Sequence, residues 1–411
     1  MNSKLRRNIF YFIMLFGIVI FFILGFVTHG QSIMGVLQRG ENDAFMDLFN
    51  SMQYGYKPYE KGVIYPPLAN LFYLILSWFF PPKYFKKGTV FVRNSHMGQV
   101  MICLSLTITV LMFMYIVLKN KKGTLNEKYL FGFIMSLSMP FLFMLERGNI
   151  IFICFACICA FLNNYRSENV IKRHLAYLAL AIAVGIKIYP VFFGFLLLRE
   201  KRWKDTFICV GYGIVIFFLP CMLFGGIQSI PLMINNIIDC TQTMGESGLG
   251  YKVSLANTGR YLGELIYQDS SRFDAVSLIL KGVCAIGGTL LMILAKYREE
   301  WKLYMIPSLM MILLPDFSFI YSLIFLLVPL WSFLDKEDMA GKVIDTLYLI
   351  LFLLIFYPIP YLDTKLLADF ERDVYPLTYG TILESLSCVL FMVLLWREGF
   401  SSILQNKKNV I

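Results

Sequence analysis

The sequence predicts an all-α polytopic membrane protein, a bundle of about 12 transmembrane or half-membrane helices forming one domain over residues 1–411. Two observations predict this fold class. Hydrophobic residues make up 58% of the 411 residues, charged residues only 16%, and the mean hydropathy is +0.66, whereas soluble domains have roughly 45–50% apolar and about 25% charged residues. Apolar runs also alternate with short basic segments along the chain. The net charge of +10 therefore indicates membrane topology and not a nucleic-acid surface.

The first element expected is a membrane helix over residues 9–27. This apolar run follows a short basic segment, residues 1–7, and is long enough to cross ~30 Å of hydrocarbon. No small-residue cleavage pattern follows it, so we expect a retained helix with a cytoplasmic N-terminus and not a cleaved signal peptide.

The other basic segments set the predicted topology of the remaining elements. They lie at residues 119–128, 166–174, 199–204, 296–302, 336–342 and from 397 onward. Because basic loops stay inside, all of them are expected in the cytoplasm, together with both termini, in a bacterial inner membrane. The segments between them are then expected outside: a first loop at residues 28–98, a turn at 146–149 between apolar runs at 129–145 and 150–162, a second large loop at 226–274, and a loop at 362–380.

Two apolar segments contain a polar residue beside a proline. Residues 175–198 are interrupted by Lys187 near Pro190, and residues 303–334 by Asp316 after Pro315. We expect both to be helical hairpins whose apices point outward and are buried in protein, because irregular backbone at membrane depth needs protein or water around it. Residues 65–80 are also apolar, but a crossing there would invert the later topology. We expect them outside, as a juxtamembrane or re-entrant element.

Under this topology the polar side chains gather on the outer side of the membrane. They are Asp43, Asp47, Glu146, Arg147, Asn149, Lys187 and Asp316. A charge within the hydrocarbon costs about 2.5–3.5 kcal/mol, so a shared extracytoplasmic cavity would explain Lys187 and Asp316. Local roles are the alternatives: a solvated loop acid for Asp43, an ion pair with Glu146 for Arg147, snorkelling for Lys187 and a helix N-cap for Asp316.

Common soluble-enzyme motifs are missing from the sequence. It contains no H-E-x-x-H, no Walker loop and no G-x-G-x-x-G, its three histidines are scattered, and its nine cysteines form no disulfide framework. Acids cluster outside, but no ligand spacing requires a metal. We therefore expect no cofactor, and a divalent metal ion at the clustered acids is the alternative.

The first loop resembles a known family. Asp43 and Asp47 are followed by Pro58-Tyr59 and then by Tyr65-Pro66-Pro67-Leu68. This pattern resembles the GT-C superfamily of integral-membrane glycosyltransferases, and most closely glycosyltransferase family 87, the polyprenyl-phosphate-mannose-dependent mannosyltransferases and their relatives. Three later elements extend the resemblance over roughly residues 10–335: Arg147-Gly148-Asn149, Lys187-Ile188-Tyr189-Pro190 and Ser318-Phe319-Ile320-Tyr321. Tyr321 stands where many members have His, so a role that depends on His cannot be transferred.

The resemblance implies transfer of a mannose-like hexose from a polyprenyl-phosphate-sugar donor to a lipid-linked or cell-envelope glycan acceptor, at the extracytoplasmic face and with inversion. It implies Asp43 or Asp47 as the base that takes the acceptor proton. Spacing to Pro58-Tyr59 favours Asp43, and the aromatic residues after Asp47 make it a close rival. Lys187 and Arg147 would bind the donor phosphate. Side chains implied in substrate binding are Tyr59, Tyr65, Glu146, Asn149, Asp316 and Tyr321.

Two other classes of membrane protein compete with this interpretation. A transporter or lipid flippase should show inverted repeats with charges at the midplane, and no convincing repeat is present. A polysaccharide polymerase or ligase of another class usually depends on a late external loop rich in Arg or His. The loop at 226–274 has only Arg260 and Arg272, and no His.

Overall fold

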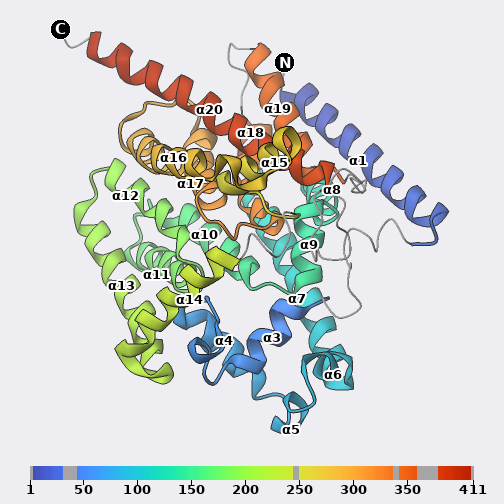
Figure 1. The fold of residues 1–411 in the computed structure, drawn as a ribbon. Helices are drawn as coiled ribbons and strands as arrows, with labels where there is room; N and C mark the ends of the chain where they lie inside the picture. The colour runs from blue at the N-terminus through green and yellow to red at the C-terminus, as the bar shows by residue number, and fades with distance from the viewer. Residues whose placement is uncertain (1–2, 31–43, 244–249, 337–341, 359–377, 409–411) are drawn as a thin grey trace.

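The computed structural model describes residues 3–30, 44–243, 250–336, 342–358 and 378–408. Over these ranges the regular elements are α- and 3-10 helices, and no β-strand is formed (Figure 1). The prediction of an all-α chain is therefore confirmed for the part of the molecule that the structure describes.

The α-helices, in chain order, are α1 (Ser3–Val27), α3 (Met46–Tyr54), α4 (Pro67–Ser77), α5 (Pro82–Phe85), α6 (Thr89–Asn94), α7 (His96–Asn120), α8 (Leu125–Ser136), α9 (Met139–Arg147), α10 (Ile151–Asn164), α11 (Val170–Ile186), α12 (Phe195–Arg199), α13 (Trp203–Cys221), α14 (Ser229–Thr243), α15 (Leu255–Tyr267), α16 (Asp274–Leu294), α17 (Glu300–Leu313), α18 (Leu327–Leu334), α19 (Lys342–Phe356) and α20 (Tyr379–Lys408). Short 3-10 helices connect several of them: η1 (Tyr59–Lys61), η2 (Tyr189–Gly194), η3 (Met222–Phe224), η4 (Gly226–Gln228), η5 (Ser270–Phe273) and η6 (Ile320–Leu326).

Five helices in the described ranges are long and apolar enough to cross a membrane. They include α1, α7, α13, α16 and α20. The pair α8 and α9 would form a sixth span, bent by 60°. The chain is thus a membrane protein by helix length and composition. The expected number of about 12 crossings is not confirmed, because the shorter apolar helices have 10 to 17 residues and a straight crossing needs about 20.

The apolar run expected at residues 129–145 is not one straight helix. It divides into α8, which ends at Ser136, and α9, which begins at Met139. Pro140 lies in the first turn of α9. A backbone N–H at that position has no acceptor within the helix, so its absence in proline removes no helical hydrogen bond. In a continuous helix the same residue would remove a hydrogen bond and clash with the preceding turn.

Both segments predicted to break do so. α11 ends at Ile186 and is followed by the extended residue Lys187 before η2 begins. α17 ends at Leu313, and η6 begins at Ile320. The first break therefore falls at Lys187, three residues before Pro190, and the second at Pro315 and Asp316.

The first large loop contains the helices α3 to α6. α4 has 11 residues and a length of about 16 Å, which is too short to cross ~30 Å of hydrocarbon. This length agrees with the juxtamembrane or re-entrant placement expected for residues 65–80. The second large loop, expected to be polar, contains the helices α14 and α15.

The basic segments meet at one end of the molecule, which we call the basic pole (Arg6, Lys121, Arg166, Lys302 and Lys336). Ion pairs join different segments there: Arg166 with Glu200 at 2.7 Å and Glu300 at 2.5 Å, Lys336 with Glu299 and Asp345 at 2.6 Å each, Lys121 with Asp335 at 2.5 Å, and Lys302 with Glu398. Arg6 donates to the carbonyl oxygen of Lys336 at 2.6 Å. These segments therefore lie at the same end of the bundle, as their charge pattern predicts.

Replacing Lys336 with Met is expected to destabilise the protein. The lysine side chain is 8% exposed and its partner Asp345 7% exposed, so the variant leaves Glu299 and Asp345 nearly buried without this cation. Breaking such a pair costs about 3–5 kcal/mol. The measurement is the free energy of unfolding in mixed micelles of increasing denaturing detergent. The same substitution at Lys122, which is exposed at the same pole, should change little, and equal losses in both variants would contradict the argument.

Candidate functional site

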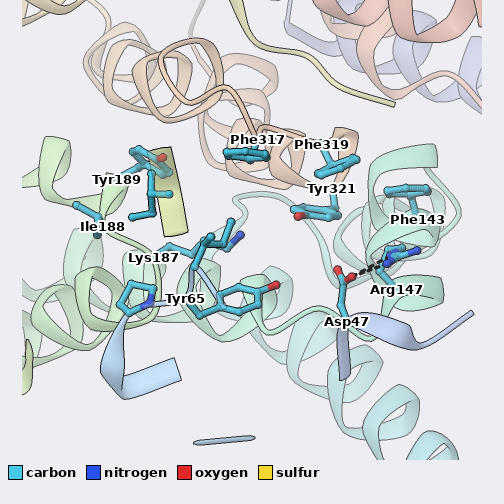
Figure 2. Close-up of a pocket in the computed structure, with 13 residues that line it drawn as sticks. Asp47, Tyr65, Phe143, Arg147, Lys187, Ile188, Tyr189, Phe317, Phe319 and Tyr321 are labelled. Carbon is cyan, nitrogen blue, oxygen red and sulfur yellow. Dashed lines mark hydrogen bonds and ion pairs between the residues drawn. The ribbon is translucent and has the colours of Figure 1, made fainter. Parts of the chain in front are cut away.

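A cavity of about 300 Å³ lies among the breaks of the helical bundle (Figure 2). Its wall comes from α3, the segment before α4, α9, the break after α11, α14, and the segment around the start of η6. The residues that line it are Asp47, Ile64, Tyr65, Pro66, Phe143, Arg147, Lys187, Ile188, Tyr189, Ile237, Phe317, Phe319 and Tyr321. Residues distant in the sequence thus converge on one space that is largely apolar and holds one carboxylate and two cations.

The carboxylate of Asp47 is held from both sides. Arg147 donates to Oδ1 from Nε at 3.1 Å and from Nη2 at 2.5 Å. Asn149 donates from Nδ2 to Oδ2 at 2.6 Å. Hydrogen bonds to an ionised group are stronger than neutral ones, so this arrangement fixes the orientation of the carboxylate in the cavity.

Local backbone geometry explains why Arg147 and Asn149 point to the same carboxylate. Arg147 is the last residue of α9, and Gly148 follows in the left-handed conformation with φ of 61°. A side chain there would be strained and would press on Leu48 of α3 at 3.1 Å. Asn149 accepts from the backbone N–H of Ile151 at 2.9 Å and so begins α10.

The start of α3 is tied to the end of α9. The backbone N–H of Phe45 donates to the carbonyl oxygen of Glu146 at 2.7 Å. Asp47 then falls in the first turn of α3, where the helix dipole favours a negative charge. The position of the carboxylate is therefore set by the backbone as well as by Arg147.

Lys187 faces the cavity from the break after α11. Its Nζ lies 5.3 Å from the ring centroid of Tyr65 and 5.4 Å from that of Tyr321, and Figure 2 shows the ammonium group between the two rings. In the described part of the chain no carboxylate forms an ion pair with Lys187. Aromatic faces stabilise a cation only partly, so the site can still gain from an anionic ligand.

Tyr65 links the two charged groups. Asn149, which also binds Asp47, donates to the Tyr65 hydroxyl at 3.3 Å. Burial, reinforced by the nearby Asp47 carboxylate, raises the pKa of Tyr65 well above its usual value. The phenol therefore stays neutral and keeps a proton that it can donate to a ligand.

Aromatic side chains form the opposite wall. The ring of Phe143 stacks on Tyr321 with centroids 6.0 Å apart, and Phe319 lies against Tyr321 at 5.6 Å. Two backbone hydrogen bonds hold this wall: Val253 to Ser318 at 2.7 Å and Ile320 to Tyr251 at 2.8 Å. This wall lowers the local dielectric, so the charges of Asp47 and Lys187 interact more strongly with a ligand than they would in water.

The structure brings five of the predicted site residues to the cavity wall, Asp47, Arg147, Lys187, Tyr65 and Tyr321, with Asn149 bonded to two of them. Other predicted residues lie elsewhere. Tyr59 is buried beside the cavity and donates from its hydroxyl to the carbonyl oxygen of Tyr65 at 3.2 Å. The backbone carbonyl oxygen of Glu146 accepts a hydrogen bond from the backbone N–H of Phe45. Asp43 lies outside the residues that the structure describes.

Asp316 lies at the apex before η6 but does not line the cavity. Its carboxylate forms an ion pair with Lys281 of α16, and its carbonyl oxygen accepts from Asn257 at 3.0 Å. Asp316 therefore fixes the segment that carries Phe317 and Phe319 into the wall. The partner Lys281 was not singled out from the sequence.

The sequence analysis also missed the aromatic residues of the wall. Phe143 lies four residues before Arg147 and therefore on the same face of α9, a helical spacing that could have identified it. Tyr189 stands inside the Lys187–Pro190 element. Phe319 stands inside the Ser318–Tyr321 element in the same way. Phe317 carries no such signal, because the position of its segment depends on pairing with residues 251–253.

A metal site is not evident in the described ranges. No group of three or more His, Cys, Asp or Glu side chains there is arranged to hold an ion. Both oxygens of Asp47 already accept hydrogen bonds from Arg147 and Asn149.

Comparison with models of protein families gives a match. The model of glycosyltransferase family 87 matches residues 64–329, a range that contains Tyr65, Arg147, Lys187 and Tyr321. No curated protein and no solved structure matches the chain.

Proposed function

The chain belongs to glycosyltransferase family 87, and from this membership and the cavity we propose that it transfers a mannose-like hexose from a polyprenyl-phosphate donor. The acceptor in this proposal is a lipid-linked or cell-envelope glycan. The observation that carries it is one cavity with a fixed carboxylate, Asp47, and a cation without a carboxylate partner in the described residues, Lys187. Glycosyl transfer from a phosphate needs these two charges: a base for the acceptor and a counter-charge for the leaving group.

The acceptor hydroxyl attacks the anomeric carbon and passes its proton to a carboxylate, Asp47 or Asp43. The bond between that carbon and the phosphate oxygen breaks, and the polyprenyl phosphate leaves with the electron pair. Lys187 compensates the charge that develops on the phosphate, in a cavity where such an interaction is strong. Attack opposite the leaving group inverts the anomeric carbon.

Arg147 and the polar residues around it take supporting roles. Arg147 and Asn149 orient Asp47, and Arg147 adds positive charge on that side of the cavity. Tyr65 and Tyr321 flank Lys187 and present rings and hydroxyls to the sugar. Tyr59 supports Tyr65 from behind, through its hydrogen bond to the Tyr65 carbonyl oxygen.

An apolar groove beside the cavity supports a lipid-linked donor. The groove has a volume of about 410 Å³ and lies between α11, η2, α12 and α13. It begins at Val191, two residues after Tyr189 of the cavity, and continues along Val210, Ile214 and Phe217. A prenyl chain is fully apolar, so it can lie there with its phosphate directed toward Lys187.

We propose that the basic pole faces the cytoplasm and that Glu60 faces the outside. Cysteines introduced at position 60 or at position 204 test this. Both positions are exposed, and Lys204 lies in the first turn of α13, at the end near the basic pole. A membrane-impermeant maleimide added to intact cells should label position 60 and leave position 204 unlabelled until lysis, against the background of the nine native cysteines. The reverse pattern would contradict the proposed orientation.

The function is tested with purified protein and a panel of polyprenyl-phosphate sugars, in EDTA because the mechanism uses no metal. A new glycosidic bond with one hexose donor supports the proposal. A protein that moves lipid-linked sugar across a bilayer without forming a covalent product is a transporter, and this outcome would overturn it.

A further inference from the structure

The segment from the end of α4 through α5 to the residues just before α6 carries an exposed surface that the proposed reaction does not use. We call it the basic–aromatic patch: Trp78, Phe79, Lys83, Lys86 and Lys87. The three lysines are exposed, as are Trp78 at 63% and Phe79 at 62%. The sequence contains no Asp or Glu between positions 60 and 127. The patch therefore has a net positive charge without acids on its own segment to offset it.

The patch lies at the opposite end of the molecule from the basic pole. α7 begins at His96, directly after α6, and ends next to Lys121 of that pole. Its 25 residues give a length of about 37 Å, more than the ~30 Å of the hydrocarbon. Figure 1 shows α5 and α6 at the edge of the molecule farthest from both termini. The lysines therefore lie on the side of the membrane where the positive-inside rule does not expect them.

An apolar groove leads away from the patch along α7. It has a volume of about 280 Å³ and is lined by Phe79, His96, Met97, Val100 and Leu104, among others. Val100 and Leu104 are more than half exposed on a membrane-spanning helix, so they face the bilayer. The groove thus shares Phe79 with the patch and continues along lipid-facing residues of α7.

We propose that the basic–aromatic patch binds the headgroup of an anionic phospholipid, with one acyl chain in the groove along α7. Lysines near a membrane surface attract anionic lipids, and exposed Trp and Phe side chains settle at the headgroup level. Binding of an anionic headgroup gives these three external lysines a role. The inference depends on the membrane placement of α7 and not on the proposed transferase activity.

The bound lipid would adjoin the helix that carries Asp47. Arg93 of α6 donates to the carbonyl oxygen of Ala44 at 3.2 Å. Gln53 of α3 reaches the carbonyl oxygen of Phe85 at 3.5 Å. A lipid bound at the patch would therefore hold α5 and α6 in place and, through these two hydrogen bonds, the segment of α3. Transferase activity would then respond to lipid binding as well.

The test is fluorescence quenching of Trp78 in nanodiscs of phosphatidylcholine that contain a minor fraction of brominated lipid. Brominated phosphatidylglycerol is compared with brominated phosphatidylcholine at the same fraction, and the Trp78→Phe variant gives the signal of the other tryptophans to subtract. We expect stronger quenching by the anionic lipid, from an enrichment of about tenfold at the patch. Equal quenching by the two lipids would overturn the proposal.

Two sets of variants make the test specific. The triple variant K83Q/K86Q/K87Q should lose the excess quenching, whereas K83R/K86R/K87R should keep it. The matched control is K122Q/K172Q/K204Q, which removes the same charge from exposed positions at the other end of the molecule. This control should keep the excess quenching by the anionic lipid. Excess quenching that survives in the first variant would overturn the proposal. So would displacement of the brominated phospholipid by a much smaller amount of polyprenyl phosphate, because the patch would then be a substrate site.

Discussion

Replacing Asp47 with Asn is expected to lower kcat/KM for hexose transfer by roughly 10³-fold, the contribution typical of a positioned general base. The amide keeps the size of the side chain and an oxygen for Arg147, but it cannot take the acceptor proton. The affinity for the donor should change little, because the donor phosphate is assigned to Lys187. Initial rates and donor dissociation constants, measured with purified protein, separate the two effects.

Two further variants control this result. Asp47→Glu keeps a carboxylate but moves it away from Arg147 and Asn149, so partial activity is expected. Glu60→Gln removes an exposed acid that pairs with Lys57 at 3.0 Å, and this variant should act like the parent chain. If Asp47→Asn retained transfer within tenfold of the parent, Asp47 would not be the base.

Asp43 is the rival carboxylate. The loss should be largest in whichever of Asp43→Asn and Asp47→Asn removes the base. A large loss in both would indicate that the two acids act together, with one orienting the other. Expression and detergent stability of each variant distinguish loss of chemistry from loss of fold.

The sequence allowed three of the charged residues at the cavity, Asp47, Arg147 and Lys187, to be predicted, because a charge in an apolar segment is costly unless a cavity or a partner receives it. Lys187 interrupts a hydrophobic segment three residues before Pro190. The proline predicts the helix break, and the charge predicts a cavity that receives it. The partner of Arg147 could not be predicted in the same way. Glu146 is its neighbour in the sequence, but a helix points adjacent side chains in different directions, and Arg147 meets Asp47 from another helix.

The number of membrane crossings could not be predicted because hydropathy does not say what covers an apolar helix. In α17 every residue from Trp301 to Leu313 is buried in the bundle, whereas many side chains of α7 and α13 are exposed where lipid would be. Both kinds of helix nevertheless stand in the sequence as apolar runs. Counting apolar runs therefore does not separate membrane crossings from short helices that pack inside the protein.

Replacing Lys187 with Met is expected to lower kcat by roughly 10²–10³-fold and to weaken donor binding as well. Met keeps the unbranched apolar stem between the rings of Tyr65 and Tyr321, so the cavity wall is preserved while the ammonium group is lost. Both effects follow if the cation binds phosphate in the ground state and binds it more strongly as the leaving group gains charge. The measurements are single-turnover rates and the inhibition constant of free polyprenyl phosphate.

The inhibition constant identifies phosphate as the group that Lys187 binds. A lysine that only supported the fold would lower activity without changing the affinity for free polyprenyl phosphate. Lys187→Arg should restore part of that affinity, since it returns the charge with a different shape. Lys57→Met, at a surface position 68% exposed, should change neither quantity. If Lys187→Met bound polyprenyl phosphate as tightly as the parent chain, the counter-charge would have to come from Arg147, and Asp47 would then be the residue that positions it.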